Sequence, residues 1–410
     1  MAPVGSYESL AAALKGGTDA VYFGIEGLNM RSRSSANFTA DDMAAIVAEC
    51  NEKGVKTYLT VNTIIYDGDI SLLDSILDRA REAGVSAIIA SDIAAIEHAR
   101  ERGLEVHIST QCNISNYEAV KFYARYADVM VLARELNLEQ VRGISERIDA
   151  DDLRGPKGER IRLEMFCHGA LCMAYSGKCY LSLHEMNSSA NRGACNQICR
   201  RSYRATDRET GESIDVENQY LMSPKDLKTI HFLNKMVDAG VRVFKIEGRA
   251  RGPEYVREAV ECYSQALEAI CNGDFTEERI EEWEGRLKKI FNRGFWNGYY
   301  LGQRLGEWSA KYGSSATRKK EYVAKALRYF PKLGVGEFKL ENGELRPGDE
   351  VVLCGPTTGA EIFTIEELRL ERDPVPVVRK GERFSTPVPC KCRASDRLYR
   401  WHEVEIKEKH

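Results

Sequence analysis

Short apolar runs alternate with amphipathic helical patterns along the first two thirds of the chain. The runs are rich in β-branched residues, and each is followed by a stretch in which apolar residues recur every three or four positions. Most of these stretches end at glycine, a common helix terminator. The pattern predicts eight strands, at residues 2–4, 19–24, 56–64, 86–91, 105–111, 128–135, 161–167 and 241–248. It predicts helices after them, at residues 7–17, 39–54, 70–84, 92–103, 116–126, 137–148, 225–240 and 253–270.

Regular alternation of strands and helices predicts a parallel sheet, because a crossover must carry the chain back before each parallel strand. Eight such units within residues 1–272 match a (β/α)8 TIM-like barrel better than an open, doubly wound sheet. A nucleotide-binding sheet is the alternative, but no G-x-G-x-x-G follows a predicted strand. We therefore predict an α/β fold built on a barrel.

The remainder of the chain has a different pattern. Residues 273–317 begin with a helical stretch and predict a connector, whereas residues 318–410 contain short alternating segments punctuated by Gly and Pro. The latter predict a small antiparallel β-barrel. The run LRPGDEV, at residues 345–351, resembles the second domain of translation elongation factors, a fold that often sits against RNA.

The last segment also carries a slight excess of basic residues. Basic runs at residues 318–320 and 390–401 mix cations with Tyr399 and Trp401, as a base-stacking and phosphate-binding surface would. A solvated barrel face explains the same pattern equally well.

Composition narrows the class of protein by exclusion. The 410 residues carry a formal net charge of −4, so any case for nucleic acid binding is local. No apolar run approaches the roughly 18 residues of a membrane span, and the first residues lack a secretory signal pattern. We expect a cytoplasmic protein with no membrane partner, and the pattern leaves the oligomeric state open. Its twelve cysteines are too sparse for a disulfide scaffold, so clustered thiols favour metal binding or redox chemistry.

Polar and charged residues follow most of the predicted strands. In a barrel of this class the chemistry lies at the carboxyl ends of the strands. Amides, guanidiniums and carboxylates there suit an anionic or strongly hydrogen-bonding substrate, although helix capping is the alternative for any single residue. We predict catalytic roles for Arg134, Glu135, His168, Glu247 and Arg249, and substrate binding by Asn29, Arg31, Asn62, Gln111, Asn113 and Lys245.

A cysteine-rich insertion follows the seventh strand, at about residues 168–224. It supplies Cys172, Cys179, Cys195 and Cys199, with spacings C-x6-C and C-x3-C. Four thiolates bind either a tetrahedral zinc ion or an iron–sulfur cluster, and the wide first spacing favours the cluster. Buried structural thiols are the alternative. Arg192 and Arg200 form part of a basic concentration beside the cysteines, which suits phosphate or a dicarboxylate.

The cysteine region carries a recognisable motif. Residues 164–182, EMFCHGALCMAYSGKCYLS, resemble the signature of the collagenase-like peptidase U32 family through Glu164, Phe166, Gly169, Ala170, Cys172, Gly177, Cys179 and Ser182. Further resemblances are APVGS at the start, NRGAC at 191–195, LMSPKDL at 221–227 and FKIEGR at 244–249.

The resemblance implies an activity and a cofactor. Characterised members carry out oxygen-independent hydroxylation of a tRNA wobble uridine with prephenate as donor, of a ribosomal RNA cytidine, or of the ubiquinone ring. It implies a 4Fe-4S cluster held by Cys172, Cys179, Cys195 and Cys199. Within the family we expect the tRNA uridine hydroxylase branch, with tRNA and a small-molecule hydroxyl donor as partners, because a C-terminal barrel has no obvious use against a lipid quinone.

Peptidase activity is the competing hypothesis. The chain contains neither H-E-x-x-H nor G-x-S-x-G. Cys167 and His168 could form a thiolate–imidazole pair only if both pointed the same way, whereas neighbours on a strand point to opposite faces. Hydroxylation is therefore favoured over proteolysis.

Overall fold

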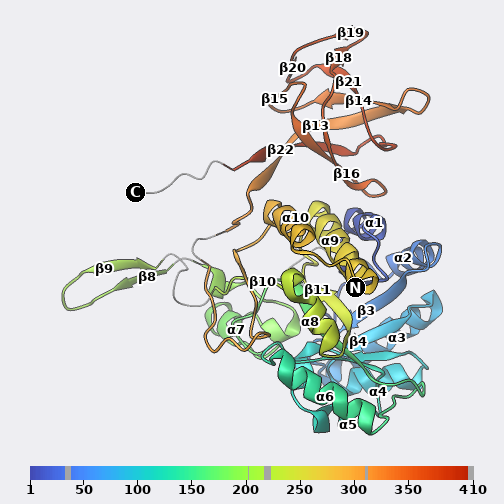
Figure 1. Cartoon of the computed structure of the whole chain (residues 1–410), viewed down its shortest axis with the longest axis vertical. Helices are drawn as coiled ribbons and strands as arrows, with labels where there is room; N and C mark the ends of the chain where they lie inside the picture. Colours follow the sequence, from blue (N-terminus) through green and yellow to red (C-terminus); the bar gives the residue numbers. More distant parts are fainter. Residues whose placement is uncertain (33–37, 202, 217–222, 310–312, 405–410) are drawn as a thin grey trace.

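The computed structural model describes residues 1–32, 38–201, 203–216, 223–309 and 313–404. Two large sheets organise these residues (Figure 1): a ten-stranded, mainly parallel sheet surrounded by helices, and an eight-stranded antiparallel sheet in the C-terminal part. Within the described ranges, no helix has the length and apolar character needed to cross a membrane.

The parallel strands follow one another in chain order across the first sheet. The last of them pairs with the free edge of its predecessor and completes a set of eight in the described part of the chain. The strands are β1 (Ala2–Pro3), β2 (Ala20–Phe23), β3 (Lys56–Val61), β4 (Ala87–Ala90), β5 (Val106–Ile108), β6 (Val129–Val131), β7 (Arg162–Gly169) and β11 (Val241–Ile246). The prediction of an α/β fold with a parallel sheet is therefore confirmed.

Two hydrogen bonds link the first and last of these strands. The amino group of Met1 donates to the carbonyl of Phe244 at 2.8 Å, and the Ile246 amide donates to the Met1 carbonyl at 3.2 Å. Closure into a complete eight-stranded barrel stays a prediction.

Helices cover the outer face of the parallel sheet. Several begin where the pattern indicated, because a polar residue caps the first turn: Ser6 accepts a hydrogen bond from the Ser9 amide, and Asn137 forms a reciprocal capping box with Gln140. The helices are α1 (Tyr7–Lys15), α2 (Asp42–Asn51), α3 (Ile70–Ala83), α4 (Ile93–Glu101), α5 (Tyr117–Tyr123), α6 (Leu138–Ala150), α8 (Leu233–Asp238) and α9 (Pro253–Asn272).

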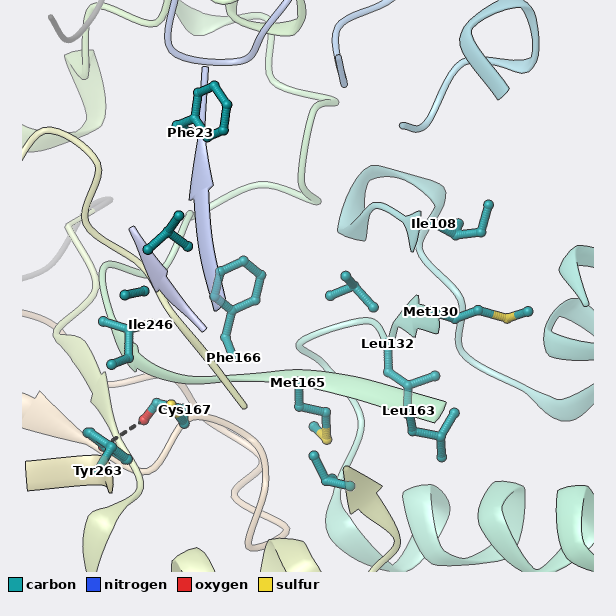
Figure 2. Close-up of a cluster of buried hydrophobic side chains, with 14 of the residues drawn as sticks. Phe23, Ile108, Met130, Leu132, Leu163, Met165, Phe166, Cys167, Ile246 and Tyr263 are labelled. Atoms are coloured by element: carbon teal, nitrogen blue, oxygen red, sulfur yellow. Dashed lines mark hydrogen bonds between the residues drawn. The ribbon is translucent and has the colours of Figure 1, made fainter. Parts of the chain in front are cut away.

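The strand β7 runs through the centre of the hydrophobic core. Figure 2 shows Phe166 on one side of this strand and Met165 on the other, so the strand contributes apolar surface in both directions. The hydroxyl of Tyr263, from α9, donates to the Cys167 carbonyl at 2.8 Å and ties the helix to the strand (Figure 2).

The predicted helix at 225–240 is wrong in its first half. Residues 226–228 form a short strand, β10 (Asp226–Lys228), which pairs antiparallel with β7 and parallel with β12 (Phe295–Trp296). All three residues of β10 are buried, so pairing with distant segments overrides the local helical pattern. A 3-10 turn (Ile230–Phe232) follows before α8 begins.

The insertion has little regular structure. It contains a short helix, a hairpin and two 3-10 turns, and residues 202 and 217–222 of the predicted insertion lie outside the described residues. The elements are α7 (Leu181–Met186), the turns Ala190–Arg192 and Ile198–Arg200, and the hairpin strands β8 (Tyr203–Thr206) and β9 (Ser213–Val216). The hairpin projects away from the body of the molecule (Figure 1).

A helix and loops connect the parallel sheet to the C-terminal sheet. Helix α10 (Glu277–Lys289) is succeeded by β12 and by loops until the first long strand begins at Arg318. The described strands of this part are β13 (Arg318–Phe330), β14 (Val335–Leu340), β15 (Glu344–Leu345), β16 (Glu350–Gly355), β17 (Gly359–Thr364), β18 (Arg369–Leu370), β19 (Asp373–Pro374), β20 (Val378–Arg379), β21 (Arg383–Pro387) and β22 (Arg397–Glu403). Stacked Phe338 and Phe384 rings, 5.5 Å apart, occupy its core.

The prediction that Tyr399 and Trp401 form a base-stacking surface is wrong for Trp401. Trp401 is only 4% exposed and packs in a small apolar cluster with Val352 and Ala360, so its faces cannot stack on bases. Tyr399 is partly exposed, but its ring meets Tyr322 and the ammonium of Lys320.

The C-terminal sheet docks against α1 and α9. Lys15 donates to the Thr358 carbonyl at 2.8 Å and pairs with Glu361 at 2.5 Å, and Lys320 pairs with Glu254 of α9 at 2.6 Å. At Gly359 the backbone of the sheet approaches α1 so closely that an added Cβ would lie 2.9 Å from the Ala12 nitrogen. The basic run at 318–320 therefore contributes to an interface within the chain.

This close approach predicts a specific sensitivity at Gly359. We expect Gly359→Ala to lower the free energy of unfolding by about 1 to 3 kcal/mol more than Gly343→Ala, because the new methyl group meets the backbone of α1. Both glycines have positive φ, 71° and 66°, but a Cβ at Gly343 would have open space within 4 Å. Urea unfolding of both variants measures the difference, and equal losses would show that the contact is loose.

Candidate active site

A cavity of about 650 Å³ lies at the carboxyl ends of the parallel strands, with one wall supplied by the insertion. This is the position that the barrel hypothesis predicted for chemistry. Twelve of the predicted site residues line it: Arg31, Asn62, Gln111, Arg134, Lys245, Glu247, Arg249, Arg200, Cys172, Cys179, Cys195 and Cys199.

Glu247 is the one carboxylate among the residues that line this cavity in the described part of the chain. Its Oε1 accepts a hydrogen bond from Arg31 Nη2 at 2.8 Å, and its Oε2 accepts one from the Tyr22 hydroxyl at 3.4 Å. Burial opposes its ionisation, but the charges of Arg31, Arg134 and Arg249 outweigh burial and lower the pKa of Glu247 to about 2. Glu247 is therefore an anion at neutral pH and a weak base.

Arg249 is buried and held from two sides. Its Nη1 donates to Thr60 Oγ1 and its Nη2 to Asn29 Oδ1, both at 3.0 Å. Burial lowers the pKa of Arg249 to about 10, so it stays charged at neutral pH. Any Cβ at Gly24 would clash with this guanidinium and with Asn29, so the glycine after β2 makes the space for it. In the sequence, Gly24 is recognisable only as a glycine that follows a strand. Its role is visible only in the fold, because the side chain for which it leaves space, Arg249, is 225 positions away.

Lys245 is paired with a residue that the cysteine motif contains. Its Nζ lies 2.8 Å from Glu164 Oε1, and neither side chain is more than 5% exposed. The ammonium also sits over the Tyr22 ring at 4.8 Å. Because Glu164 neutralises Lys245, the pair adds little net charge to the cavity.

A second basic group occupies the rim near the insertion. Arg200 Nη1 donates to the Pro224 carbonyl at 2.6 Å and its Nη2 to the Leu171 carbonyl at 2.5 Å. Arg251 and Arg293 lie nearby, and the group surrounds Asp226, whose pKa burial raises although these arginines oppose the shift. Sequence analysis missed Arg251 and Arg293 because both lie within loops, away from the residue that directly follows a predicted strand.

The lining residues are strongly unbalanced in charge. They comprise eight lysines and arginines against one carboxylate. Glu164 and Asp226 offset part of this excess from outside the lining. The remaining positive charge favours an anionic ligand.

The four cysteines of the insertion face this same cavity and are free thiols. Burial raises the pKa of Cys179 and Cys199, and neighbouring thiols of the group raise both further. The charge of Glu247 chiefly, and that of Cys195 in addition, raises the pKa of Arg31, which places the cysteine group beside the strand-end arginines.

As thiolates, neighbouring members of this group would raise one another's pKa by repulsion. Such a set becomes stable in its ionised form when a cation binds between its members, so its chemistry fits a metal or cluster. As placed, the described residues contain no group of three or more His, Cys, Asp or Glu side chains arranged to hold a metal ion.

Gly193 allows the insertion to pack closely against the loop after β2. At Gly193, with φ of 81°, an added Cβ would clash with the Asn29 carbonyl and the Ser32 hydroxyl. The segment that carries Cys195 and Cys199 therefore packs directly on the loop after β2.

Five predicted residues do not line this cavity: Asn113 and Glu135 line a smaller one, described below, and the other three lie elsewhere. Asn29 is fully buried beneath Arg249 and also accepts from the Arg31 amide at 2.9 Å, so it holds both arginines in place. Arg192 pairs with Asp69 at 2.5 Å and donates to the Ile64 carbonyl at 2.7 Å, which fastens the insertion to the loop after β3. Asn29 and Arg192 therefore hold other parts of the chain in place.

His168 is the third, and it lies among aromatic rings. It is 1% exposed and packs against Tyr255, Tyr263 and Phe295. Burial lowers its pKa to about 3, so the ring is neutral at physiological pH. The adjacent Cys167 thiol donates to the Lys245 carbonyl at 3.4 Å, and burial raises its pKa to about 12. Neither group has the ionisation state of an activated cysteine nucleophile.

Asn113 and Glu135 line a smaller adjoining cavity of about 210 Å³. Arg134 and Cys172 line both spaces, so the two cavities share a wall. The structure thus divides the predicted strand-end residues between two neighbouring spaces.

Comparison with known proteins gives a consistent family. The sequence profile described as peptidase family U32 matches residues 5–310. A Porphyromonas gingivalis protein named collagenase is 64% identical over 99% of this chain and 98% of its own. The Bacillus subtilis tRNA hydroxylation protein P1 is 32% identical over 92% of this chain and 90% of its own. The Escherichia coli 23S rRNA 5-hydroxycytidine C2501 synthase is 36% identical over 73% of this chain and 44% of its own.

The low pKa of Glu247 predicts how stability depends on pH. The ordinary value is 4.5 and the folded value is about 2, so the ionised form stabilises the fold above pH 4.5 and this contribution is lost as the pH falls toward 2. We expect Glu247→Gln to lower the free energy of unfolding by about 3 kcal/mol at pH 7, because three guanidiniums lose their counter-charge. At pH 3.5 the loss should be smaller by about 1 kcal/mol. Urea unfolding at both pH values tests this, with the exposed Glu268→Gln as control; a loss independent of pH would contradict the assignment.

Proposed function

Because the chain belongs to peptidase family U32, we propose that it hydroxylates an RNA pyrimidine, a tRNA wobble uridine, without molecular oxygen. The observation that carries this proposal is the cationic strand-end cavity whose wall contains four free thiols. Relatives named for hydroxylation of tRNA and of ribosomal RNA support it. Ribosomal RNA cytidine is the nearest alternative substrate, and ubiquinone is a more distant one.

We assign the 4Fe-4S cluster to Cys172, Cys179, Cys195 and Cys199. When bound, it would supply redox-active iron at the cavity wall. The neighbouring arginines support this assignment, because a cluster with four thiolate ligands carries net negative charge and Arg31 lines the same cavity as Cys195.

The hydroxyl donor is proposed to be prephenate, a dicarboxylate. A guanidinium binds a carboxylate through two parallel hydrogen bonds, and the cavity offers several guanidiniums. Arg134 is the best placed, because its Nε is buried without a hydrogen-bond partner among the described residues. Its guanidinium carbon lies 3.9 Å from the centre of the Phe166 ring, a cation–π contact that restricts its movement.

Arg31, Arg249 and Glu247 have a supporting role in this scheme. Glu247 holds Arg31 by a direct ion pair, and Thr60 and Asn29 hold Arg249. Because these contacts fix the guanidiniums before a ligand arrives, an anionic donor would bind without reordering them.

We further infer that the eight parallel strands close into a barrel through Met1. The hydrogen bonds from Met1 to β11 support this closure, because they join the two ends of the strand order. Closure would bring the loops after β2 and β11, which carry Arg31 and Arg249, to the same rim.

Peptidase activity is the second candidate, and the name of the 64% identical relative favours it. The buried Cys167 and the neutral His168 argue against a cysteine nucleophile at that position. The eight cationic lining residues also suit a phosphate- or carboxylate-bearing substrate better than a neutral peptide bond.

One experiment separates these functions. The protein, reconstituted anaerobically with iron and sulfide, is incubated with prephenate and tRNA that lacks the modification, and nucleosides are quantified by mass spectrometry. We expect 5-hydroxyuridine that depends on both protein and prephenate. A parallel assay measures gelatin cleavage by the same preparation, and gelatin cleavage without any hydroxylated nucleoside would overturn the proposal.

The cysteine assignment predicts four sensitive positions. We expect Cys172→Ala, Cys179→Ala, Cys195→Ala and Cys199→Ala each to lose most of the iron and acid-labile sulfide, because a cluster with a missing ligand is open to solvent. Cys271→Ala, at an exposed thiol of α9, is the matched control and should retain wild-type content. Zinc without sulfide in the wild type would reassign the group to a structural metal site.

A further inference from the structure

The smaller cavity beside the cysteine group is walled by aromatic side chains. Trp296, Tyr299 and Trp308 line it, and we call this space the aromatic pocket. Trp296 belongs to β12, and Trp308 forms an isolated bridge with Pro224. The pocket thus depends on segments from the end of the insertion and from the connector after α10.

The aromatic pocket opens toward the proposed chemistry. Arg134, Cys172 and Thr110 line it and the larger cavity as well. A flat group seated in the pocket would therefore have an edge beside Cys172. Its neighbour in the larger cavity would be whatever Arg134 binds.

Trp296 points to a polar ligand. Its ring is 5% exposed, and its Nε1 is buried without a hydrogen-bond partner among the described residues. A buried N–H without an acceptor is unfavourable, and a ligand carbonyl would relieve it. Tyr299 meets Trp296 edge-on at 5.3 Å, so the tryptophan ring is held at a fixed angle.

The absence of a side chain at Gly306 keeps the aromatic pocket open. A Cβ there would lie 3.5 Å from the Tyr299 hydroxyl, 3.6 Å from the Trp296 ring and 3.9 Å from the Trp308 ring. A methyl group would therefore touch all three aromatics, and a larger side chain would fill the space between them. The glycine has no positive φ, so its value lies in the room that it leaves.

Polar groups complete the rim of the pocket. Glu135 is exposed and Asn113 is half-buried, and both line the space. A carboxylate accepts from an imide N–H, and an amide both donates and accepts. Together with the free indole N–H, these groups complement the alternating N–H and C=O edge of a uracil ring.

We propose that the aromatic pocket binds the pyrimidine ring of the nucleotide that is modified, turned out of its stack. The proposal rests on the proposed RNA hydroxylation and adds the place where the base sits. Stacking on aromatic side chains and hydrogen bonding along the base edge are how proteins hold single bases. A phenylalanine side chain of a peptide would fill the same space but would leave the Trp296 N–H and Glu135 without partners.

Equilibrium dialysis with uridine 5′-monophosphate tests the pocket without requiring turnover. We expect Gly306→Val and Trp296→Phe each to weaken binding about tenfold, because one fills the pocket and the other removes the N–H donor. Trp401→Phe, in the C-terminal sheet, is the matched control and should bind as wild type does. Iron and sulfide content should be normal in all three, which separates loss of the base site from loss of the cluster.

The outcomes divide cleanly. Failure of the wild type to bind the nucleotide, or binding as tight as wild type by both Gly306→Val and Trp296→Phe, would overturn the pocket. Binding of N-acetylphenylalanine amide, lost in Gly306→Val, with no binding of the nucleotide would reassign the space to a peptide side chain. Gly306-dependent nucleotide binding by a protein that hydroxylates no RNA would retain the pocket and remove the proposed reaction.

Discussion

Charge compensation inside a buried cavity is the constraint on which this structure depends. Guanidiniums converge at the strand ends, and three of them act on one carboxylate, Glu247. Glu164 neutralises Lys245, and Asp226 pairs with Arg293. What remains is a surplus of positive charge facing four thiols. Surplus cations are unfavourable in a low-dielectric space unless an anion lies beside them, and thiols become anionic when they bind a metal or cluster.

The sequence predicted the features that are local. Alternating apolar runs identified the parallel strands, and reading the residue after each strand found Arg31, Arg134, Glu247 and Arg249 because parallel strands end on one side of a sheet. Features that depend on residues distant in the sequence could not be predicted. β10 was assigned to a helix because its pairing with β7 and β12 is invisible locally. The burial of His168 and Trp401, and the space left by Gly24 and Gly306, likewise require the folded neighbours.

The C-terminal sheet changes what its basic residues mean. Arg318 pairs with Glu350, and Lys320 with Glu254 of α9. These cations are engaged in holding the sheet together and against the helices, so a run of positive letters is weaker evidence for RNA than the sequence suggested. The stronger evidence for an anionic ligand lies at the strand ends, where the arginines are buried and held in fixed directions.

The β8–β9 hairpin divides the site along the chain. All four insertion cysteines precede it, whereas Lys245, Glu247 and Arg249 follow it, and its turn at 207–212 is exposed along its length. The two halves of the cavity are therefore encoded on either side of a peripheral loop that contributes no lining residue in the described structure. Such a loop is a natural place to split the gene or to insert a reporter, since the two fragments would meet again through the strand pairing of β7 with β11.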